Sequence, residues 1–396
     1  MSTTASTELP LAGITVVALE QAVAGPFCSR QLADLGARVI KIERPDGGDF
    51  ARSYDGALHG HSAYFAWLNR GKESVVLDLK SQAGRAALHA LVLRADVFVH
   101  NMVPGAVERL GLSYDAVAAR APRLVWVGIS GYGPDGPYRD KKAYDMLIQA
   151  EAGVVSLTGT PDAPAKVGIS VADISAGLYA HASVLAALRT RDRTGRGDRI
   201  DISMFECLVE WVMPQLYVQL GTGEPPPRAG LRHNMIVPYG AYRCLDGEVM
   251  FSIQNDREWR RFCGIVLRRA ELADDATFVG NAERVTNRRE LERLIEMTFE
   301  RLPVREVIER LEEGDIANAA VNSLGVVAVH PQLAARGRWT TVETPTGPIP
   351  ALWPPHNLAN VVPRMLAVPA LGEHTAAVLA ELASAAAPGT STNDIA

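Results

Sequence analysis

The sequence predicts an α/β protein that has a large domain with a parallel sheet and a smaller α+β domain. Buried strands alternate with helices over the first two hundred residues, which favours a parallel sheet with helices on both faces. The pattern changes after Met204, and the Gly/Pro-rich stretch "GTGEPPPRAG" reads as a linker. A chain of 396 residues is long enough for more than one domain.

Short apolar runs define the strands of the large domain. We expect strands at residues 13–19, 38–43, 74–79, 95–101 and 123–133, separated by helical segments such as "GPFCSRQLADLG". Open parallel sheets bind their ligands beyond the carboxyl ends of the strands. The loops after Glu43, Asn101 and Gly133 are therefore expected at the functional end of the sheet.

The remainder of the chain predicts a second fold of mixed type. A long helix at about 205–220 precedes the linker, and Asp246-Gly247 is a strong signal for the turn of a β-hairpin. Helices are expected at about 256–266, 281–302 and 304–313. A β-rich stretch, "RWTTVETPTGPIPAL", a helix at about 373–382 and a Ser/Ala/Thr tail close the chain.

Composition excludes several classes of protein. A net charge of −5 and a pI of about 6.0 argue against a nucleic-acid-binding protein. No run of 18 apolar residues predicts a transmembrane helix, and the N-terminus lacks the features of a secretory signal. The four cysteines are far apart and show no metal-binding spacing. We therefore expect a reduced, cytoplasmic protein without a metal site, a membrane anchor or a nucleic-acid partner.

One acid, Asp173, stands at a predicted strand-to-helix junction in "KVGISVADISAGLYAH". Residues 167–171 alternate as in a strand, and the chain from Ile174 onward has a helical pattern. Aspartate at such a junction is a favoured N-cap, because its carboxylate accepts a hydrogen bond from a free amide of the first turn. A nucleophilic carboxylate is the alternative, and this stretch alone leaves both open.

Cationic and amide side chains stand near the proposed carboxyl ends of the strands. In a protein with a net negative charge, such a gathering predicts an anion-binding edge. Its members are Arg44, Lys72, Asn101, Arg109 and Lys142.

A glycine pattern, "GYGPDG", offers a second class of function. It matches GxGxxG formally, which would indicate a nicotinamide-dependent oxidoreductase. The dinucleotide fingerprint needs its last glycines at the start of a helix, whereas Pro134 and Pro137 predict a turn here.

Seven segments, in the same order along the chain, together resemble the class III CoA-transferases, the CaiB/BaiF family. "PYGAYRCLDG" and "GEHTAAVLAEL" extend the resemblance toward the C-terminus. The seven are "GPFCSRQLADLGARVIKIERPDGGD", "NRGKESVVLDLK", "ADVFVHNMVPGAVERLGL", "ISGYGPDGPY", "KKAYDMLIQAEAG", "VADISAGLYA" and "RTGRGDRIDISMFE".

The resemblance implies an interlocked homodimer, in which each subunit is a ring threaded by the other. It places residues 1–205 in the first part of the large, Rossmann-like CoA-binding domain, and 206–235 in a helix and linker. Residues 236–330 form the small α+β domain, and 331–396 return to complete the large domain, with a disordered tail.

The resemblance also implies a covalent mechanism. The family's nucleophile matches Asp173, whose carboxylate attacks a donor acyl-CoA thioester to give a mixed anhydride. The CoA thiolate then forms an aspartyl-CoA thioester, from which CoA passes to the acceptor acid. Amides at the helix N-terminus are expected to hold the developing oxyanion. CoA and acyl-CoA are substrates, and no permanently bound cofactor is expected.

The same resemblance assigns the CoA site and the acyl pocket. Arg44, Asn101, Arg109 and Lys142 match family positions that contact CoA, and Lys72 is a candidate for its 3′-phosphate. Tyr144 matches a position beside the thioester, and Tyr54 a position near the acyl pocket.

Two activities of the family remain open, CoA transfer and acyl-CoA epimerisation. Racemases of the family carry a His at the position of Tyr144, and a tyrosine is a poor base at neutral pH, so transfer is favoured. The chain lacks the run of four glycines of oxalate-transferring members, and "LRHNMIVPYG" stands in its place. His233 and Asn234 are thus candidates for acceptor recognition. Arg228, Arg232 and Arg243 around this segment suggest a short dicarboxylic acid.

Overall fold

The computed structural model describes residues 9–385 and divides into two compact units. The first unit holds the segments up to Ala152, Gly168–Trp211 and the chain from Leu333 onward. The second unit holds Gly153–Val167 and Val212–Gln332. The segment Gly153–Val167, expected in the large domain, thus groups with the second unit. The predicted disordered tail lies at 386–396, outside the described residues.

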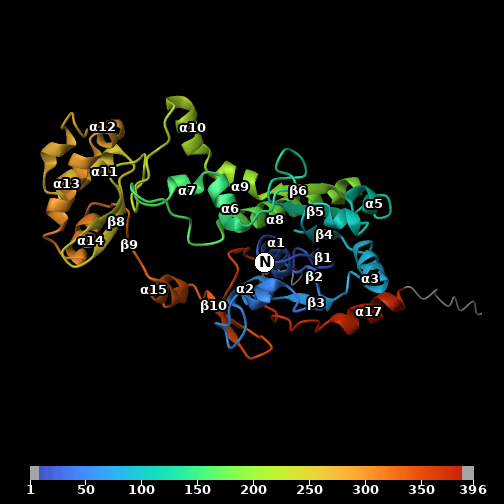
Figure 1. Cartoon of the computed structure of the whole chain (residues 1–396). Coiled ribbons are helices and arrows are strands. Elements are labelled where there is room, and N and C mark those ends of the chain that lie inside the picture. Colours follow the sequence, from blue (N-terminus) through green and yellow to red (C-terminus); the bar gives the residue numbers. More distant parts are fainter. Residues whose placement is uncertain (1–8, 386–396) are drawn as a thin grey trace, which may run out of the picture. The chain divides into compact units, whose positions relative to one another are not determined.

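Within the described residues, six parallel strands form the sheet of the first unit in the order β3-β2-β1-β4-β5-β6 (Figure 1). The predicted parallel α/β fold is therefore confirmed. The order reverses between β1 and β4, and ligands of such sheets bind at the carboxyl ends of the strands near that point. The strands are β1 (Thr15–Leu19), β2 (Arg38–Glu43), β3 (Lys72–Val76), β4 (Val97–His100), β5 (Val125–Ser130) and β6 (Arg199–Ser203).

Helices pack on both faces of this sheet. α1 (Ala24–Asp34) and α8 (Val171–Thr194) lie so close together that a Cβ on Gly177 would meet the Ala24 carbonyl oxygen at 2.8 Å. Alternate strand residues such as Val17 and Phe98 form a separate hydrophobic cluster with α3 (Gln82–Val92) and α17 (Thr375–Ser384). The other helical segments of this unit are η1 (Phe50–Ser53), α2 (Ala63–Asn69), α4 (Ala106–Arg109), α5 (Tyr114–Ala118), α6 (Asp145–Glu151) and α9 (Met204–Trp211).

The helix predicted at about 205–220 is two helices, α9 and α10 (Met213–Thr222). Pro214 lies in the first turn of α10. Proline is favourable there, but inside a continuous helix its missing N–H and its ring would break the hydrogen-bond ladder. The break coincides with the boundary between the two units.

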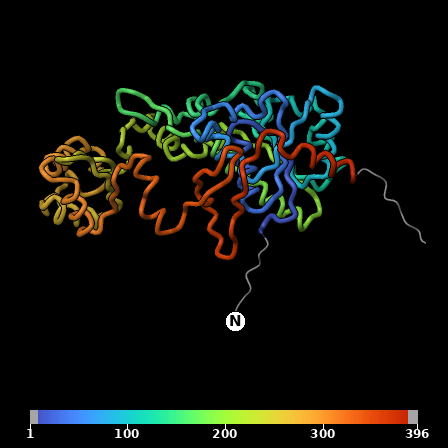
Figure 2. The backbone as a smooth tube through the Cα atoms, turned by 90° about the horizontal axis from the view of Figure 1, so that it is seen from below, coloured from blue at the N-terminus to red at the C-terminus, as the bar shows by residue number. Residues whose placement is uncertain are grey.

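The C-terminal segment returns to the first unit and runs along its N-terminal strands (Figure 2). It carries the antiparallel pair β10 (Trp339–Val342) and β11 (Ile349–Leu352), followed by α17. Ser74 Oγ accepts a hydrogen bond from the Gly372 amide at 2.8 Å, and the Arg38 guanidinium pairs with Glu381 at 2.8 Å. Segments from both ends of the chain therefore build this unit.

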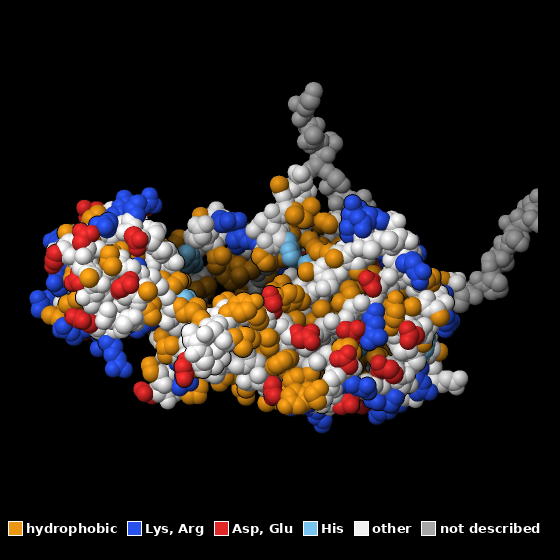
Figure 3. Space-filling model, turned by 90° about the horizontal axis from the view of Figure 1, so that it is seen from above, with side chains coloured by type: hydrophobic (Ala, Val, Ile, Leu, Met, Phe, Trp, Pro, Cys, Tyr) orange, Lys and Arg blue, Asp and Glu red, His pale blue; other side chains and the backbone are white. Residues whose placement is uncertain are grey.

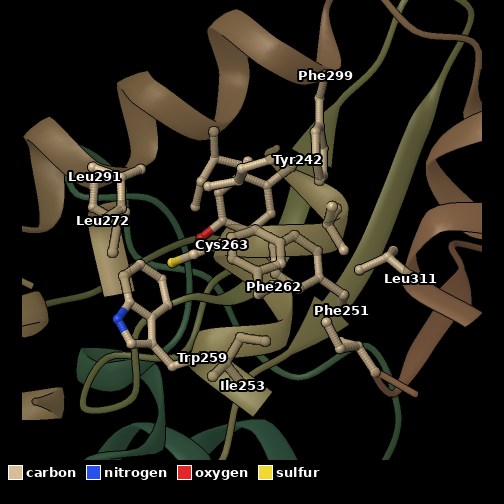
Figure 4. Packing of buried hydrophobic residues seen from close by; sticks show 14 of the residues in the cluster. Tyr242, Phe251, Ile253, Trp259, Phe262, Cys263, Leu272, Leu291, Phe299 and Leu311 are labelled. Atoms are coloured by element: carbon tan, nitrogen blue, oxygen red, sulfur yellow. The ribbon is translucent and has the colours of Figure 1, made fainter. Parts of the chain in front are cut away.

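The second unit is α+β, with an antiparallel sheet in the order β7-β8-β9. β7 (Tyr239–Arg243) and β8 (Glu248–Ser252) form the predicted hairpin, and β9 (Asn318–Ala320) pairs with β8. Its core is rich in aromatic side chains, including Tyr242, Phe251 and Phe299 (Figure 4). The helix predicted at 281–302 breaks at Asn287 into α12 and α13. The helical segments are α7 (Val154–Leu157), α11 (Asp256–Arg261), η2 (Phe262–Val266), η3 (Ala270–Ala273), α12 (Asn281–Thr286), α13 (Arg288–Phe299), α14 (Val304–Glu313) and α15 (Leu324–Ala328), and α16 (Pro331–Ala335) spans the unit boundary.

Among the described residues, α8 is the one helix long and apolar enough to cross a membrane, by length and composition only. It has 24 residues, and half of its most apolar window is buried inside the protein, as in a core helix. On the face drawn in Figure 3, acidic and basic side chains are interspersed with patches of hydrophobic ones.

Candidate active site

Asp173 lies in the first turn of α8, but it is not the cap of this helix. The N-cap position is Ser170, whose side chain makes no capping hydrogen bond. Instead, Asp145 Oδ1 accepts hydrogen bonds from the amides of Ala172 at 2.8 Å and Asp173 at 3.3 Å. The prediction that Asp173 caps the helix is therefore wrong. The strand expected at 167–171 is also absent from the described structure, where the chain bends without strand pairing.

The Asp173 carboxylate has no hydrogen-bond donor or ion-pair partner among the described residues. Desolvation by the surrounding protein, and then the charge of Asp145, raise the pKa of Asp173 to about 7. The helix N-terminus partly offsets this cost, because its dipole favours a negative charge. A carboxylate whose charged form is poorly stabilised, and whose side chain is only partly buried, has the environment of a reactive group.

Two predicted pocket residues lie in the electrostatic neighbourhood of this carboxylate. Tyr144 is the N-cap residue of α6, directly before Asp145, and is 66% exposed. Tyr54 follows η1, and partial burial together with the charges of Asp49 and Asp173 raises the pKa of Tyr54 to about 12. Its phenol therefore keeps its proton and is a hydrogen-bond donor at neutral pH.

A row of aromatic side chains, not singled out by the sequence, leads from Tyr54 toward α8. Ring centroids are 5.7 Å apart for Tyr54 and Tyr64, 6.3 Å for Tyr64 and Trp67, and 5.4 Å for Trp67 and Phe27. Phe27 packs against Gly177, one helical turn after Asp173. The spacing of two exposed aromatic residues in "HSAYFAWLNR" was the available signal, since i and i+3 share a helix face.

Three of the predicted cations remain available for an anionic ligand. Arg44 follows β2, Arg109 ends α4, and Lys142 precedes α6; each is exposed and unpaired among the described residues. The neighbouring Lys141, by contrast, pairs with Glu151 at 2.9 Å. Unpaired arginines and lysines at the carboxyl ends of strands suit phosphate groups.

Lys72 is different, because its ammonium group is enclosed. Its side chain is 0% exposed, and Nζ donates to Glu20 Oε1 at 2.7 Å, Asn69 Oδ1 at 3.0 Å and the Pro26 carbonyl at 3.1 Å. An ammonium group has three donors, so all of them are used. Lys72 also lies at the amino end of β3, which corrects its expected position near a carboxyl end. We therefore leave it out of the proposed CoA site.

Asn101 fixes the turn that follows β1. Its Oδ1 accepts from the Gln21 amide at 2.9 Å, and its Nδ2 donates to the Gln21 carbonyl at 2.7 Å. Ala22, which follows Gln21, has a φ of 62°, and its amide donates a hydrogen bond to Asp49 Oδ1 at 3.0 Å. The side chain predicted to contact CoA thus shapes the loop at the strand-order reversal, and Gln21 is a position that the sequence did not mark.

His233 and Asn234 belong to the second unit. The His233 ring stacks on Tyr239 with centroids 5.2 Å apart, and its Nδ1 accepts from the amides of Met235 and Ile236, both at 3.1 Å. The proton of this neutral ring is thereby assigned to Nε2. Arg288 donates to the carbonyl oxygens of both His233 and Asn234.

Two of the three arginines thought to surround this segment have other roles. Arg228 donates to the carbonyls of Thr160 and Pro161, each at 2.9 Å. Arg232 forms ion pairs with Glu292 and Glu296. Their side chains therefore give little support to the prediction of a dicarboxylic acceptor. "GYGPDG" is a turn after β5, and no helix starts between it and α6 in the described structure, so the dinucleotide interpretation is not supported either.

The fold is that of the CoA-transferases with which the chain is compared next. The sequence matches the family model of CoA-transferase family III over residues 11–375, and the chain belongs to this family. It is an enzyme that uses CoA thioesters as substrates.

Named relatives and solved structures agree with this family. The chain is 36% identical to the succinate–glutarate CoA-transferase of Agrobacterium fabrum, covering 94% of this chain and 96% of that protein. It is 35% identical to the acetyl-CoA:oxalate CoA-transferase of Acetobacter aceti, with 85% and 86% coverage. A CaiB/BaiF family protein from Brucella suis has a TM-score of 0.82 at 34% identity, with 95% and 100% coverage.

Proposed function

We propose that this enzyme moves CoA from a donor acyl-CoA to a free, short dicarboxylic acid, with Asp173 as the nucleophile. The observation that carries the proposal is the unpartnered Asp173 carboxylate with its raised pKa. The names of the relatives, which include succinate, glutarate, oxalate and mesaconate transferases, support a dicarboxylic substrate.

The chemistry proceeds through two kinds of covalent intermediate. An Asp173 oxygen attacks the thioester carbon of the donor, and the CoA thiolate leaves as a mixed anhydride forms. The thiolate then attacks the aspartyl carbon of the anhydride, which releases the donor acid and leaves an aspartyl-CoA thioester. The acceptor carboxylate then attacks the aspartyl carbon of this thioester, which releases the CoA thiolate and forms a second mixed anhydride. The thiolate attacks the acceptor's acyl carbon of that anhydride, which gives acceptor-CoA and frees the Asp173 carboxylate. Each step is easier than direct exchange between two acids.

The oxyanions of these steps need donors other than the first amides of α8. The amides of Ala172 and Asp173 already donate to Asp145. The Tyr54 phenol is one available donor. The free amides at the N-terminus of α1 are a second source of donors, because no side chain caps this helix. They lie near the nucleophile, since Ala24 packs against α8 at Gly177, one turn after Asp173.

The CoA moiety binds along the carboxyl edge of the sheet in this proposal. Arg44, Arg109 and Lys142 supply charge for its phosphates, and Asn101 acts by holding the Gln21 turn. The aromatic row from Tyr54 to Phe27 offers an apolar surface to the acyl chain or the pantetheine arm. His233 Nε2–H and Asn234 remain candidates for the acceptor carboxylate.

The functional protein in this proposal is an interlocked homodimer. The chain leaves the first unit after Trp211 and returns at Leu333, as a ring-forming subunit requires. No residue of α10 is buried in the single chain, which supports its coverage by a second copy.

Trapping the intermediate tests the nucleophile. With succinyl-CoA and no acceptor, the enzyme should accumulate CoA on Asp173, and hydroxylamine should convert the thioester to a hydroxamate that peptide mass mapping can locate. Repeated mapping to another residue would contradict the assignment. Epimerisation is tested separately by exchange of the α-proton of a branched acyl-CoA in deuterated water, where we expect transfer to an added acid and no exchange.

A further inference from the structure

Asp49 is a buried carboxylate that connects two separate backbone turns of the first unit. Its Oδ1 accepts hydrogen bonds from the Ala22 amide at 3.0 Å and from the Ala51 amide at 2.9 Å. Ala22 belongs to the turn between β1 and α1, whereas Ala51 belongs to η1. One oxygen atom therefore ties together two segments that α1 and β2 separate along the chain.

The turn at Ala22 has a conformation that must be held by its surroundings. Its φ of 62° lies in the left-handed region, which a residue with a Cβ rarely adopts and which persists only where contacts enforce it. Asp49 holds the Ala22 amide from one side. From the other side, Asn101 binds the amide and the carbonyl of Gln21. The turn leads directly to Val23, the N-cap residue of α1, so it sets where the free amides of that helix lie.

The second turn held by Asp49 carries Tyr54. Asp49 is the N-cap residue of η1, and Tyr54 is its C-cap residue. Burial first, and then the charges of Asp49 and Asp173, raise the pKa of Tyr54, so its phenol lies near both carboxylates. The position of the phenol beside Asp173 therefore depends on the turn that Asp49 caps.

A neutral network of buried charges holds Asp49 in place. Its Oδ2 accepts from Lys41 Nζ at 2.8 Å, and both side chains are 0% exposed. Its own amide donates to Glu43 Oε2 at 2.9 Å. A buried ammonium group without its partner is costly, so Lys41 restricts where the Asp49 carboxylate can lie. In the part of the chain that the structure describes, the network joins three acids and three bases, which are Glu20, Glu43, Asp49, Lys41, Lys72 and Arg52.

We propose that Asp49 is a positioning residue of the transfer reaction, which holds the Tyr54 phenol and the first amides of α1 in fixed places around Asp173. Asp49 is enclosed and does not reach the substrate, so it acts through the amides of Ala22 and Ala51. The inference rests on the proposed function, which makes Asp173 the nucleophile and these groups the oxyanion donors. Donors fixed in advance stabilise a developing charge without rearrangement, and a misplacement of about 1 Å can slow a reaction about a hundredfold.

Paired substitutions test this role without leaving an unpaired charge in the interior. Lys41 and Asp49 have opposite charges, so replacing both keeps the network neutral, and its other acids stay paired with its other bases. Lys41→Met/Asp49→Asn retains a side-chain oxygen for the two amides, whereas Lys41→Met/Asp49→Ala removes it. The two variants have the same charge and differ in the acceptor, so the asparagine variant is the matched control.

The rate at which CoA accumulates on Asp173 is measured in a single turnover with succinyl-CoA and no acceptor, and is normalised to the folded fraction by circular dichroism. We expect the asparagine variant to stay within about threefold of the wild-type rate, and the alanine variant to react about tenfold or more slowly. The KM for succinyl-CoA in transfer should change by less than about twofold, because the phosphate-binding cations are untouched. A merely structural role would lower Tm and leave the rate per folded molecule unchanged. Equal rates in the two variants would therefore overturn the proposal.

Tyr54→Phe in both variants tests whether Asp49 acts through the phenol. The loss of the hydroxyl should slow the asparagine variant about tenfold or more and the alanine variant less than about threefold, because a misplaced phenol no longer donates to the oxyanion. Equal losses in the two backgrounds would also overturn the proposal.

A serine variant covers the case in which the alanine variant does not fold. In Lys41→Met/Asp49→Ser the hydroxyl still caps η1, but it is one bond shorter and does not reach the Ala22 amide as well. The same slower single turnover is expected, and a rate equal to that of the asparagine variant would overturn the proposal. If the wild type forms no adduct on Asp173, the proposed nucleophile fails and this inference fails with it. If the wild type forms the adduct and the variants react equally, this inference fails alone.

Discussion

Asp173 can be tested by a substitution that leaves the helix intact. Because Asp145 caps α8, the change to Asn removes a carboxylate without removing a cap. We expect Asp173→Asn to abolish transfer, with residual activity below about one part in a thousand, in line with the loss of other covalent nucleophiles. Steady-state transfer assays on protein shown to be free of deamidation measure this. An active, undeamidated Asp173→Asn enzyme would refute the mechanism.

The same substitution should stabilise the fold in a pH-dependent way. The pKa of Asp173 is raised in the folded state to about 7, so its contribution is fully favourable below about pH 4 and is lost as the pH rises through 7. Above that pH the ionised group costs about 4 kcal/mol relative to the unfolded chain. Asp173→Asn should therefore raise Tm at pH 8 and change it little at pH 4. An equal difference at both pH values would argue against a raised pKa.

Transfer itself should depend on the ionisation of Asp173. Only the carboxylate attacks the thioester, so log kcat/KM should rise with pH up to about 7 and level off above it. Initial rates measured as a function of pH, in buffers of constant ionic strength, test this rise of kcat/KM. A flat profile from about pH 5.5 to 8 would mean that the group titrates well below the range expected from its burial.

The sequence located single residues better than it assigned their contacts. The position of Asp173 before an apolar helix identified it as a candidate. The side chain that caps this helix, however, is Asp145, which is 28 residues away in the chain. Lys72 was predicted near a strand end as a candidate for the CoA 3′-phosphate, but its ammonium group is enclosed by contacts with Glu20, the Pro26 carbonyl of α1 and Asn69. Asn101 stood at a strand end as predicted, but the turn that it holds comes from β1. Such pairings arise from tertiary packing and leave no local pattern.

At the scale of elements, the N-termini of α6 and α8 meet through one carboxylate. In Asp145→Asn the side-chain oxygen still accepts from the two amides, but the charge near Asp173 is gone. The pKa of Asp173 should fall, and the acid limb of the transfer profile should move to lower pH. Asp145→Ala is the control that loses the cap as well, with about 1 kcal/mol of destabilisation. A limb that does not move in Asp145→Asn would show that desolvation alone sets the pKa.

The close approach of α1 and α8 should be sensitive to a single methyl group. In Gly177→Ala the new Cβ would meet the Ala24 carbonyl and the Phe27 ring, and we expect a loss of about 1–3 kcal/mol in the free energy of unfolding. Urea denaturation measures it. Gly264→Ala in η2, an exposed position where nothing lies within 4 Å, is the matched control and should be neutral or stabilising. Equal effects at the two sites would mean that the helices separate freely.

Local signals predicted the elements well where they were strong. β2 and α14 have the predicted bounds, and the hairpin turns at Asp246-Gly247 as expected. The prediction was wrong where a local pattern had two meanings. The alternation at 167–171 is that of a strand, but the segment has no partner strand among the described residues. Pro214 was read as part of a continuous helix, although proline at that position begins a new one.

At the scale of the whole molecule, the chain leaves the first unit and later returns to it, as the proposed interlocked dimer would require. The second unit is inserted between segments that build the first, and the returning segment is bound there by Arg38–Glu381 and Gly372–Ser74 contacts. In the single chain α10 leaves Leu220 72% exposed. Tyr217, three residues earlier on the same helix face, is 66% exposed, and adjoining exposed apolar side chains mark a site of interaction with another chain. Composition alone could not predict the return of the chain to the first unit or the exposed apolar side chains of α10, because composition does not encode the path of the chain.

Subunit exchange tests the interlocked dimer most directly. Two threaded rings cannot separate unless one of them unfolds, so dilution and mixing should have no effect under native conditions. We expect sedimentation at nanomolar concentration to find dimer only. When dimers with two different affinity tags are mixed, no doubly tagged dimer should form over a day, whereas unfolding and refolding the mixture should produce it. A conventional dimer would exchange at a rate set by its dissociation, independent of unfolding. Doubly tagged dimer formed in native buffer, or folded monomer at high dilution, would exclude threading while leaving the assignment of Asp173 untouched.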